Sequence, residues 1–342
     1  MFAGTKTKPI LNRRSEMELL DAVRTQKERT RLMLNNILFA TDFSPSSEMA
    51  LRYALTLARH YHAEIHIIQA VALDSVDAIA SGARQHALDE ERPFAIRGAK
   101  KLLLSGKLDG VRHQVLVGEE GKSVLPTLLH NQDFDLFVNG VGNREGHTLL
   151  LEPTVEEAIR RSQCPLLSVG SSFHASFDGE LKSIVFATDF SPESLEASRY
   201  ALSLAQEFQA RLTLLHVVEG FEPRPSDEKA YVARPYKLWL SKLVPDEARL
   251  WSELDFAVEF GRPADRILQV AWENHADLIV VGARGLDRLT SPGLNVRKVM
   301  CNAWCPVLTV SGVLESQKLE RFWKAAAAAS ESQEQEMITE VS

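Results

Sequence analysis

The stretch Ile37-Leu-Phe-Ala-Thr-Asp-Phe-Ser-Pro45 occurs a second time as Ile184-Val-Phe-Ala-Thr-Asp-Phe-Ser-Pro192, with eight of the nine residues identical. Further along, Tyr53-Ala-Leu-Thr-Leu-Ala58 returns as Tyr200-Ala-Leu-Ser-Leu-Ala205, and both matches have the same offset of 147 residues. This period is far too long for the stacked units of a solenoid. The repeat therefore predicts two copies of one domain, each with its own hydrophobic core.

The ends of the two copies match as well, which gives the expected domain boundaries. Cys164-Pro-Leu-Leu-Ser-Val169 corresponds to Cys305-Pro-Val-Leu-Thr-Val310 at an offset of 141 residues. The order is kept while the offset drifts, as expected for a duplicated domain with insertions and deletions in its loops. The expected organisation is an N-terminal extension at 1–33, domain 1 at 34–170, a linker at 171–181, domain 2 at 182–313 and a C-terminal tail at 314–342.

Within each copy, short apolar runs alternate with stretches of helical periodicity. The run Ile37–Ala40 predicts a buried strand, and Ser44 followed by Pro45 predicts the N-cap and first turn of a helix. Strands are expected near 37–40, 65–71, 111–117, 134–139, 166–169, 184–187, 212–218, 255–260, 278–281 and 307–310. Further helices are expected near 91–104, 123–130, 155–161, 193–207, 264–274 and 296–303. Five strands alternating with helices in each half predict an α/β fold with two doubly wound, five-stranded parallel sheets flanked by helices.

The composition is that of a globular protein, with 45% hydrophobic and 25% charged residues. No apolar run is long enough to cross a bilayer, and the N-terminus lacks the apolar core of a secretory signal. The net charge of -7 argues against a nucleic-acid partner. Three cysteines, Cys164, Cys301 and Cys305, cannot form a disulfide framework and fit a reducing compartment. We therefore expect a cytoplasmic protein that binds neither membranes nor nucleic acids.

The repeated motifs together resemble the universal stress protein family. They are a first strand ending in Ala-Thr-Asp-Phe-Ser-Pro, a fourth strand running into a Gly-rich loop, and a closing Cys-Pro-apolar strand. The resemblance covers both copies and most of the chain. It implies Rossmann-like domains of the adenine nucleotide alpha hydrolase-like type, often paired through the last strand. It also implies that the chain belongs to one of two groups in the family, the members that bind ATP or the members that bind no nucleotide.

An aspartate follows the first strand of each copy, as Asp42 and Asp189. Ligands of open parallel sheets bind at the carboxyl ends of the strands, where the strand order reverses. A carboxylate at this point can accept hydrogen bonds from ribose hydroxyls or from an adenine amine. It can equally cap the turn or the following helix, and one aspartate can play both roles.

The phosphate-binding loop expected from the resemblance is Gly-x-x-Gly, nine residues, and then Gly-Ser or Gly-Thr. Domain 1 has Gly140 and Thr154 at matching positions. Asn143 and Pro153 stand where two further glycines are expected, and proline has no N–H to offer a phosphate. Domain 1 is therefore the weaker candidate for ATP binding.

Domain 2 keeps the first half of this motif as Gly282-Ala-Arg284-Gly285, in which Arg284 can pair with a phosphate. The second half, Gly293-Leu-Asn295-Val296, is one residue short and has no Ser or Thr after its glycine. We expect ATP, if bound, in domain 2, with Asp189 at the sugar or base and Val217 lining the adenine pocket. Gly282, Arg284, Gly285, Gly293 and Asn295 would then lie near the phosphates.

The histidines of domain 1 do not predict a metal site. His60, His62 and His66 correspond to non-histidine residues in domain 2, namely Glu207, Gln209 and Thr213, so the repeat does not keep the set. Cys301 and Cys305, four residues apart, could share a helix face, but they have no further ligand nearby and are expected to be buried as small apolar residues.

The leading interpretation is a stress-response protein that binds and regulates, with adenine nucleotide binding and no enzymatic turnover. A weak ATP hydrolase and an interaction scaffold that binds no nucleotide stay open as alternatives. The two domains are expected to form an intrachain pseudo-dimer, with a homo-oligomer left open. As apolar sheet edges, Leu166–Val169 and Val307–Val310 are expected to cover one another.

Overall fold

The computed structural model describes residues 32–41, 43–69, 96–116, 134–141, 164–170, 180–220, 226–245, 248, 252–283 and 294–311. Domain 1 contributes β1 (Asn36–Thr41), β2 (Glu64–Gln69), β3 (His113–Leu116), β4 (Leu136–Val141) and β5 (Leu166–Gly170). Domain 2 contributes β6 (Ser183–Ala187), β7 (Arg211–Val218), β8 (Leu254–Phe260), β9 (Leu278–Ala283) and β10 (Val307–Ser311). These strands agree with the expected ones to within a few residues at each end.

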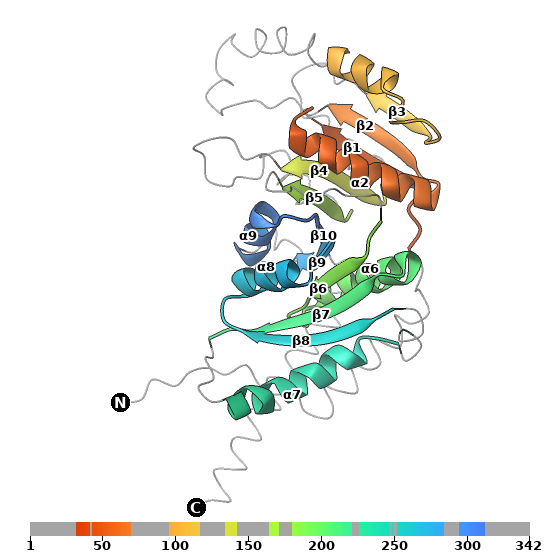
Figure 1. Cartoon of the computed structure of the whole chain (residues 1–342). Helices are drawn as coiled ribbons and strands as arrows, with labels where there is room; N and C mark the ends of the chain where they lie inside the picture. Colours follow the sequence, from red (N-terminus) through yellow and green to blue (C-terminus); the bar gives the residue numbers. More distant parts are fainter. Residues whose placement is uncertain are drawn as a thin grey trace, which may run out of the picture.

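All of these strands belong to one 10-stranded sheet in the order β3-β2-β1-β4-β5-β10-β9-β6-β7-β8 (Figure 1). Every pair of neighbours within one domain is parallel. The prediction of a five-stranded parallel sheet in each half is therefore confirmed, and the second half repeats the strand order of the first.

The two half-sheets join through an antiparallel pair, β5 and β10. Val307 lies opposite Ser168, Leu308 opposite Leu167, and Thr309 opposite Leu166. The prediction that the closing strands cover one another is confirmed, and the pairing removes two apolar edges that would invite aggregation. We call this strand pair, with the side chains of the helices above it, the domain junction.

Helices cover both faces of the sheet (Figure 1). One core cluster joins α2 (Pro45–Tyr61), α6 (Pro192–Phe208), α7 (Ser226–Lys242) and the helical residues 96–104 to one face. On the other face lie α8 (Pro263–Glu273) and α9 (Leu294–Asn302). The result is a three-layer α/β/α arrangement. Within the described part of the chain, no helix is both long and apolar enough to span a membrane.

The first helix of each domain begins as expected from the sequence. Ser44 is the N-cap of α2, where its Oγ accepts a hydrogen bond from the backbone N of Ser47 at 3.2 Å, and Pro45 opens the helix. Ser191 caps α6 in the same way. The same local sequence thus builds the same turn twice.

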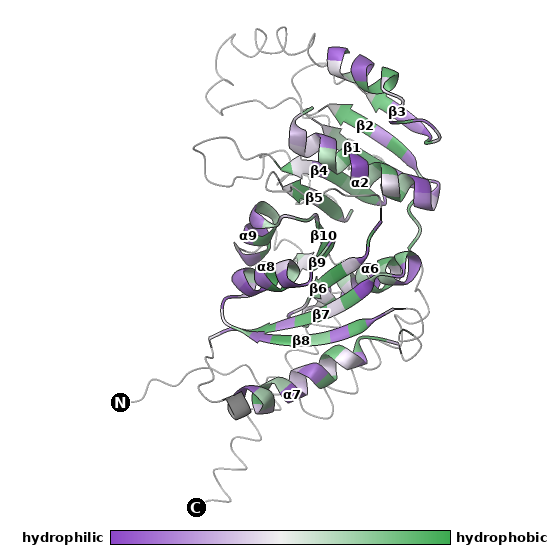
Figure 2. Cartoon of the chain, in the orientation of Figure 1, coloured by the Kyte–Doolittle hydropathy of each residue, from purple (hydrophilic) through white to green (hydrophobic). Residues whose placement is uncertain are grey.

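The strands are buried on both faces, as expected for a parallel sheet between two helical layers. Ile184 and Phe186 point into one core cluster and Val185 into the other, and all three are fully buried. Figure 2 shows the central strands as the most hydrophobic part of the molecule, with polar residues on the outer helix faces.

Candidate functional site

The carboxyl end of β6 lies between the ends of β7 and β9, because β6 pairs with both strands. From β6 the chain runs outward to β7 and β8, and it crosses to the other side of β6 for β9. In an open parallel sheet, this reversal leaves a crevice between the two directions of winding. The equivalent point in domain 1 is the carboxyl end of β1, between β2 and β4.

Thr188, buried directly after β6, organises the loop at this crevice. Its Oγ1 accepts a hydrogen bond from the backbone N of Phe190 at 2.9 Å and lies 2.8 Å from Oγ of Ser194. Oδ1 of Asp189 accepts a hydrogen bond from the backbone N of Ser191 at 3.0 Å, while Asp189 itself is exposed. The turn-capping role considered for Asp189 is therefore confirmed, and its contact with a ligand stays a prediction.

The same loop recurs in domain 1. The backbone N of Phe43 donates to Oγ1 of Thr41 at 2.9 Å, and φ is 58° at Phe43 and 60° at Phe190. The role of Thr41 and Thr188 was not predicted from the sequence, although both threonines lie in the repeated stretch and could have been found there. Asp42 lies outside the described residues.

Gly282, near the end of β9, allows a close approach between the sheet and α6. A Cβ at Gly282 would lie 2.3 Å from the backbone N of Ser194 and 2.5 Å from the carbonyl carbon of Glu193. A Cβ at Gly140 in β4 would likewise lie 2.4 Å from the backbone N of Ser47 in α2. Both glycines are thus needed for packing, whether or not a ligand binds. The packing also sets the amino end of α6 beside the crevice, where the helix dipole favours an anion.

The structure brings Asp189, Val217 and Gly282 to the carboxyl ends of three adjacent strands, β6, β7 and β9. Val217 is half-buried and pairs with Glu259 of β8. Asn295 is exposed in the first turn of α9. The other predicted site residues lie outside the described part of the chain: Arg284, Gly285 and Gly293 in domain 2, and Thr154, with Asn143 and Pro153, in domain 1.

Four aromatic side chains gather at the same edge, a feature that sequence analysis missed. Nδ1 of His216 donates to the carbonyl oxygen of Thr188 at 2.8 Å, and its ring stacks on Tyr236 with centroids 4.6 Å apart. Phe190 contacts both His216 and Trp239, with centroid distances of 4.8 and 5.6 Å. Burial raises the pKa of Tyr236. These rings fix the loop after β6 against α7.

The histidines of domain 1 lie in separate environments. The ring of His60 stacks on Phe208 at 4.4 Å, His62 is the left-handed C-cap of α2, and His66 packs edge-on against Phe134 at 5.2 Å. Over the residues that the structure describes, no group of three or more His, Cys, Asp or Glu side chains could hold a metal ion.

The cysteines are free thiols. Cys301 lies in α9 and Cys305 beyond its end, so the idea that the two share one helix face is wrong. Both are buried, as expected. Burial raises the pKa of Cys164 to about 12 and also raises the pKa of Cys305, so these thiols are poor nucleophiles.

The universal stress protein family matches the chain twice, at residues 33–170 and 180–311. The chain therefore belongs to the universal stress protein family, with two family domains in tandem. A universal stress protein of Thermus aquaticus is 36% identical over 141 residues, which cover 38% of this chain and 98% of the relative. One from Methanocaldococcus jannaschii is 33% identical over 147 residues, covering 38% of this chain and 81% of the relative.

Solved structures show the same architecture across both domains. A universal stress protein from Archaeoglobus fulgidus has a TM-score of 0.58 at 18% identity, covering 82% of this chain and 99% of that one. A functionally unknown protein from Pseudomonas aeruginosa has a TM-score of 0.52 at 16% identity, covering 86% of this chain and 98% of that one. At such identities the likeness shows the fold alone.

Proposed function

We propose that this tandem universal stress protein binds an adenine nucleotide in domain 2 and acts by binding rather than by turnover. The observation that carries the proposal is the reversal of strand order at the carboxyl end of β6, between β7 and β9. There the exposed Asp189, the amino end of α6 and Gly282 lie at one edge of the sheet. This is the place where open α/β sheets bind ligands.

Each group has a physical role in the proposal. The carboxylate of Asp189 accepts hydrogen bonds from the ribose or the base, because the residue is exposed. Its Oδ1 also caps the turn, which holds the side chain in place. Val217 offers a half-buried apolar surface to the base. The amino end of α6, held against Gly282, favours the negative phosphates, and Arg284 supplies a full charge.

Domain 1 shares part of this arrangement but offers the phosphates less. Gly140 holds the amino end of α2 as Gly282 holds that of α6. However, Asn143 and Pro153 replace glycines of the family motif, and Pro153 removes a backbone donor. We therefore propose that domain 1 serves mainly as the structural partner of domain 2.

Isothermal titration of the full chain with ATP, ADP and AMP tests the proposal. We expect one site per chain, lost or weakened at least tenfold in Asp189→Ala and unchanged in the repeat-related control Asp42→Ala. Asp189→Asn keeps an oxygen that can cap Ser191 and separates loss of charge from loss of the turn. Binding that survives Asp189→Ala but disappears in Asp42→Ala would place the site in domain 1. No heat with any nucleotide would favour a nucleotide-independent scaffold, and steady phosphate release would favour a hydrolase.

A further inference from the structure

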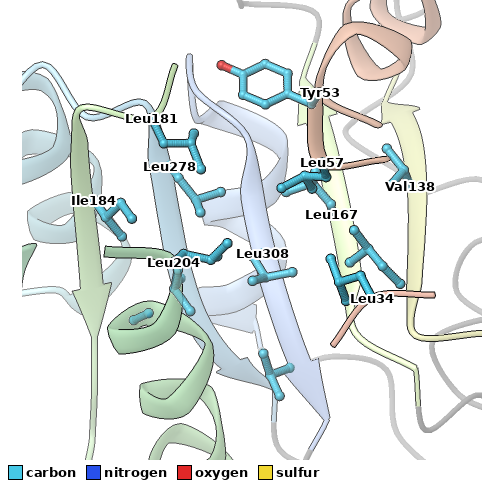
Figure 3. Packing of buried hydrophobic residues seen from close by; sticks show 14 of the residues in the cluster. Leu34, Tyr53, Leu57, Val138, Leu167, Leu181, Ile184, Leu204, Leu278 and Leu308 are labelled. Carbon is cyan, nitrogen blue, oxygen red and sulfur yellow. The ribbon is translucent and has the colours of Figure 1, made fainter. Parts of the chain in front are cut away.

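The two domains are closely equivalent where they meet. Figure 3 shows apolar residues of both copies converging on the β5–β10 pair, and several of them are repeat partners. The equivalent pairs include Leu34 with Leu181, Leu57 with Leu204, and Leu167 with Leu308. The features that distinguish the two domains as binding sites therefore lie away from the domain junction, at the carboxyl edges of the two half-sheets.

The loop after the first strand of each domain adopts a backbone conformation that needs support. Phe190 has a φ of 60°, in the left-handed region that bulky side chains rarely adopt. Its domain-1 equivalent, Phe43, has a φ of 58°. The amide of each phenylalanine donates to the threonine Oγ1 two residues earlier at 2.9 Å. This hydrogen bond is thus the same in both copies, and the packing around the phenylalanine ring is what differs.

In domain 2 aromatic side chains enclose the ring. Phe190 is only 3% exposed and lies against His216 of β7 and Trp239 of α7. Tyr236 completes the group, because it stacks on His216 and meets Trp239 edge-on at a centroid distance of 5.5 Å. We call Phe190, His216, Tyr236 and Trp239 the aromatic latch. Through two of its side chains, α7 packs against the loop after β6.

His216 also holds the backbone that leads into Asp189. The amide of Thr188 donates to the carbonyl oxygen of Leu215 at 2.9 Å, and its carbonyl oxygen accepts from Nδ1 of His216 at 2.8 Å. The peptide groups on both sides of Thr188 are therefore bound to β7, beyond the last residue of β6. Asp189 follows directly, so its position depends on this attachment.

Domain 1 lacks these partners for its phenylalanine. Gln69 occupies the position of His216. Gly98 occupies that of Trp239, since each lies 15 residues before the start of the third strand of its copy, β3 or β8. The ring of Phe43 lies directly on Gly98, where an added Cβ would be 2.4 Å from a ring carbon, and Phe43 is only half-buried. The same strained turn therefore has less support in domain 1.

We propose that the aromatic latch holds the loop after β6 in its nucleotide-binding conformation before any ligand arrives, and so makes domain 2 the tighter-binding domain. It acts through Asp189, so its members are positioning residues. Apparent affinity scales with the fraction of molecules that are already in the competent conformation, and a loop held in advance loses less free energy on binding. This inference rests on the nucleotide binding proposed above.

Amide exchange of the ligand-free full chain, followed residue by residue by NMR, tests the latch without nucleotide. The amides of Phe190 and Phe43 make the same hydrogen bond, so their exchange rates compare the support of the two loops. We expect Phe190 to exchange at least about tenfold more slowly than Phe43. His216→Gln, which introduces the domain-1 residue, should bring the rate of Phe190 close to that of Phe43. Equal rates in the wild type would overturn the proposal.

Isothermal titration of the full chain measures the effect on binding. We expect His216→Gln to weaken ATP, ADP and AMP by the same factor of about ten, because the loop is affected and the phosphate contacts are not. Tyr236→Ala should act in the same way, whereas Tyr236→Phe keeps the stacked ring and should recover most of the affinity. Gln69→His, the matched change in domain 1, is the control and should leave the affinity unchanged. Wild-type affinity in His216→Gln, or a loss confined to ATP, would contradict the positioning role.

The two experiments separate this inference from the proposed function. If nucleotide binds and Phe190 exchanges as fast as Phe43, nucleotide binding is supported and the latch alone is wrong. If Phe190 is protected as expected but the wild type binds no nucleotide, the proposed function fails. The positioning role then fails with it, and only the support of the loop by the aromatic rings is confirmed.

Discussion

Nε2 of His60, at the end of α2, lies 3.4 Å from Oε2 of Glu207, at the end of α6. The two residues occupy equivalent positions in the two copies, 147 residues apart. Residues related by a two-fold rotation can touch each other only when they lie close to the axis. This contact therefore marks where the pseudo-symmetry axis passes on the α2 and α6 side of the sheet, and the stacking of His60 on Phe208 supports it.

Changing His60 to Glu should place two carboxylates against each other near the axis. We expect His60→Glu to lower the free energy of unfolding by about 0.5–1 kcal/mol, because like charges repel and this contact is partly shielded from solvent. Urea denaturation at low ionic strength measures the loss. His60→Gln, which keeps a neutral side chain, should lose less, and equal losses in the two variants would show that charge plays no part.

Substituting Gly282 or Gly140 by Ala should destabilise the protein without any ligand. The added Cβ would meet backbone atoms of α6 or α2 at 2.3 and 2.4 Å, so the helix must shift, and we expect a loss of about 1–3 kcal/mol in each case. Thermal denaturation of the ligand-free protein measures the effect. Gly220→Asn is the control for a substitution without a close approach: nothing lies within 4 Å of its Cβ, and Asn tolerates the φ of 76° better than most residues, so the loss should be smaller. Unchanged stability in Gly282→Ala would show that the close approach is not required.

The stability of the domain junction should fall at high pH through Tyr200. Burial, with a smaller contribution from Glu196, raises the pKa of Tyr200 to about 12, whereas an unfolded tyrosine has a pKa of about 10. Between these values the unfolded state binds fewer protons than the folded state, so stability decreases as pH rises. The slope from this residue is on the order of 1 kcal/mol per pH unit. Comparing the free energy of unfolding of Tyr200→Phe with that of the wild type from pH 9 to 12 isolates this contribution. Parallel curves of stability against pH would contradict a raised pKa at Tyr200.

Chains cut inside the expected linker should reassemble through β5 and β10. We expect fragments 1–175 and 176–342 each to fold cooperatively, because each carries a complete half-sheet, and to form a 1:1 complex that buries both closing strands. Leu308→Asp should abolish the complex, since Leu308 lies opposite Leu167 in the pairing. Asp255→Asn, on the distant strand β8, is the control. Circular dichroism measures the folding of each fragment, and light scattering measures the mass of the complex. Two unfolded fragments that do not fold on mixing would refute the two-domain organisation.

The strands and the junction could be predicted from the sequence because they depend on short apolar runs and on exact internal repetition. Helix α7 could not, because Pro235 lies inside it and a proline normally ends a helical pattern. The aromatic residues that α7 brings to the crevice were missed for the same reason. Here tertiary packing outweighs a local signal.

The role of Gly282 shows a different limit. Its place in a family motif suggested contact with phosphates, which stays a prediction, and the structure adds a packing role against Ser194 that the motif did not reveal. How closely two elements approach depends on the assembled fold, so no spacing in the sequence reveals it. The contact between His60 and Glu207 could have been predicted in part, because the repeat shows that the two residues are equivalent. The repeat alone does not show that this pair lies close to the two-fold axis, where equivalent residues can touch.

The antiparallel pairing of β5 with β10 has a directional consequence. Because the two half-sheets run in opposite directions, the carboxyl ends of β1 and β4 open on one rim of the molecule, and those of β6 and β9 open on the other. Whatever each domain holds at its own rim faces away from the other, so one small ligand cannot bridge both. The two carboxyl edges lie on opposite rims of one continuous sheet, so the residues at one edge can change without altering the other edge.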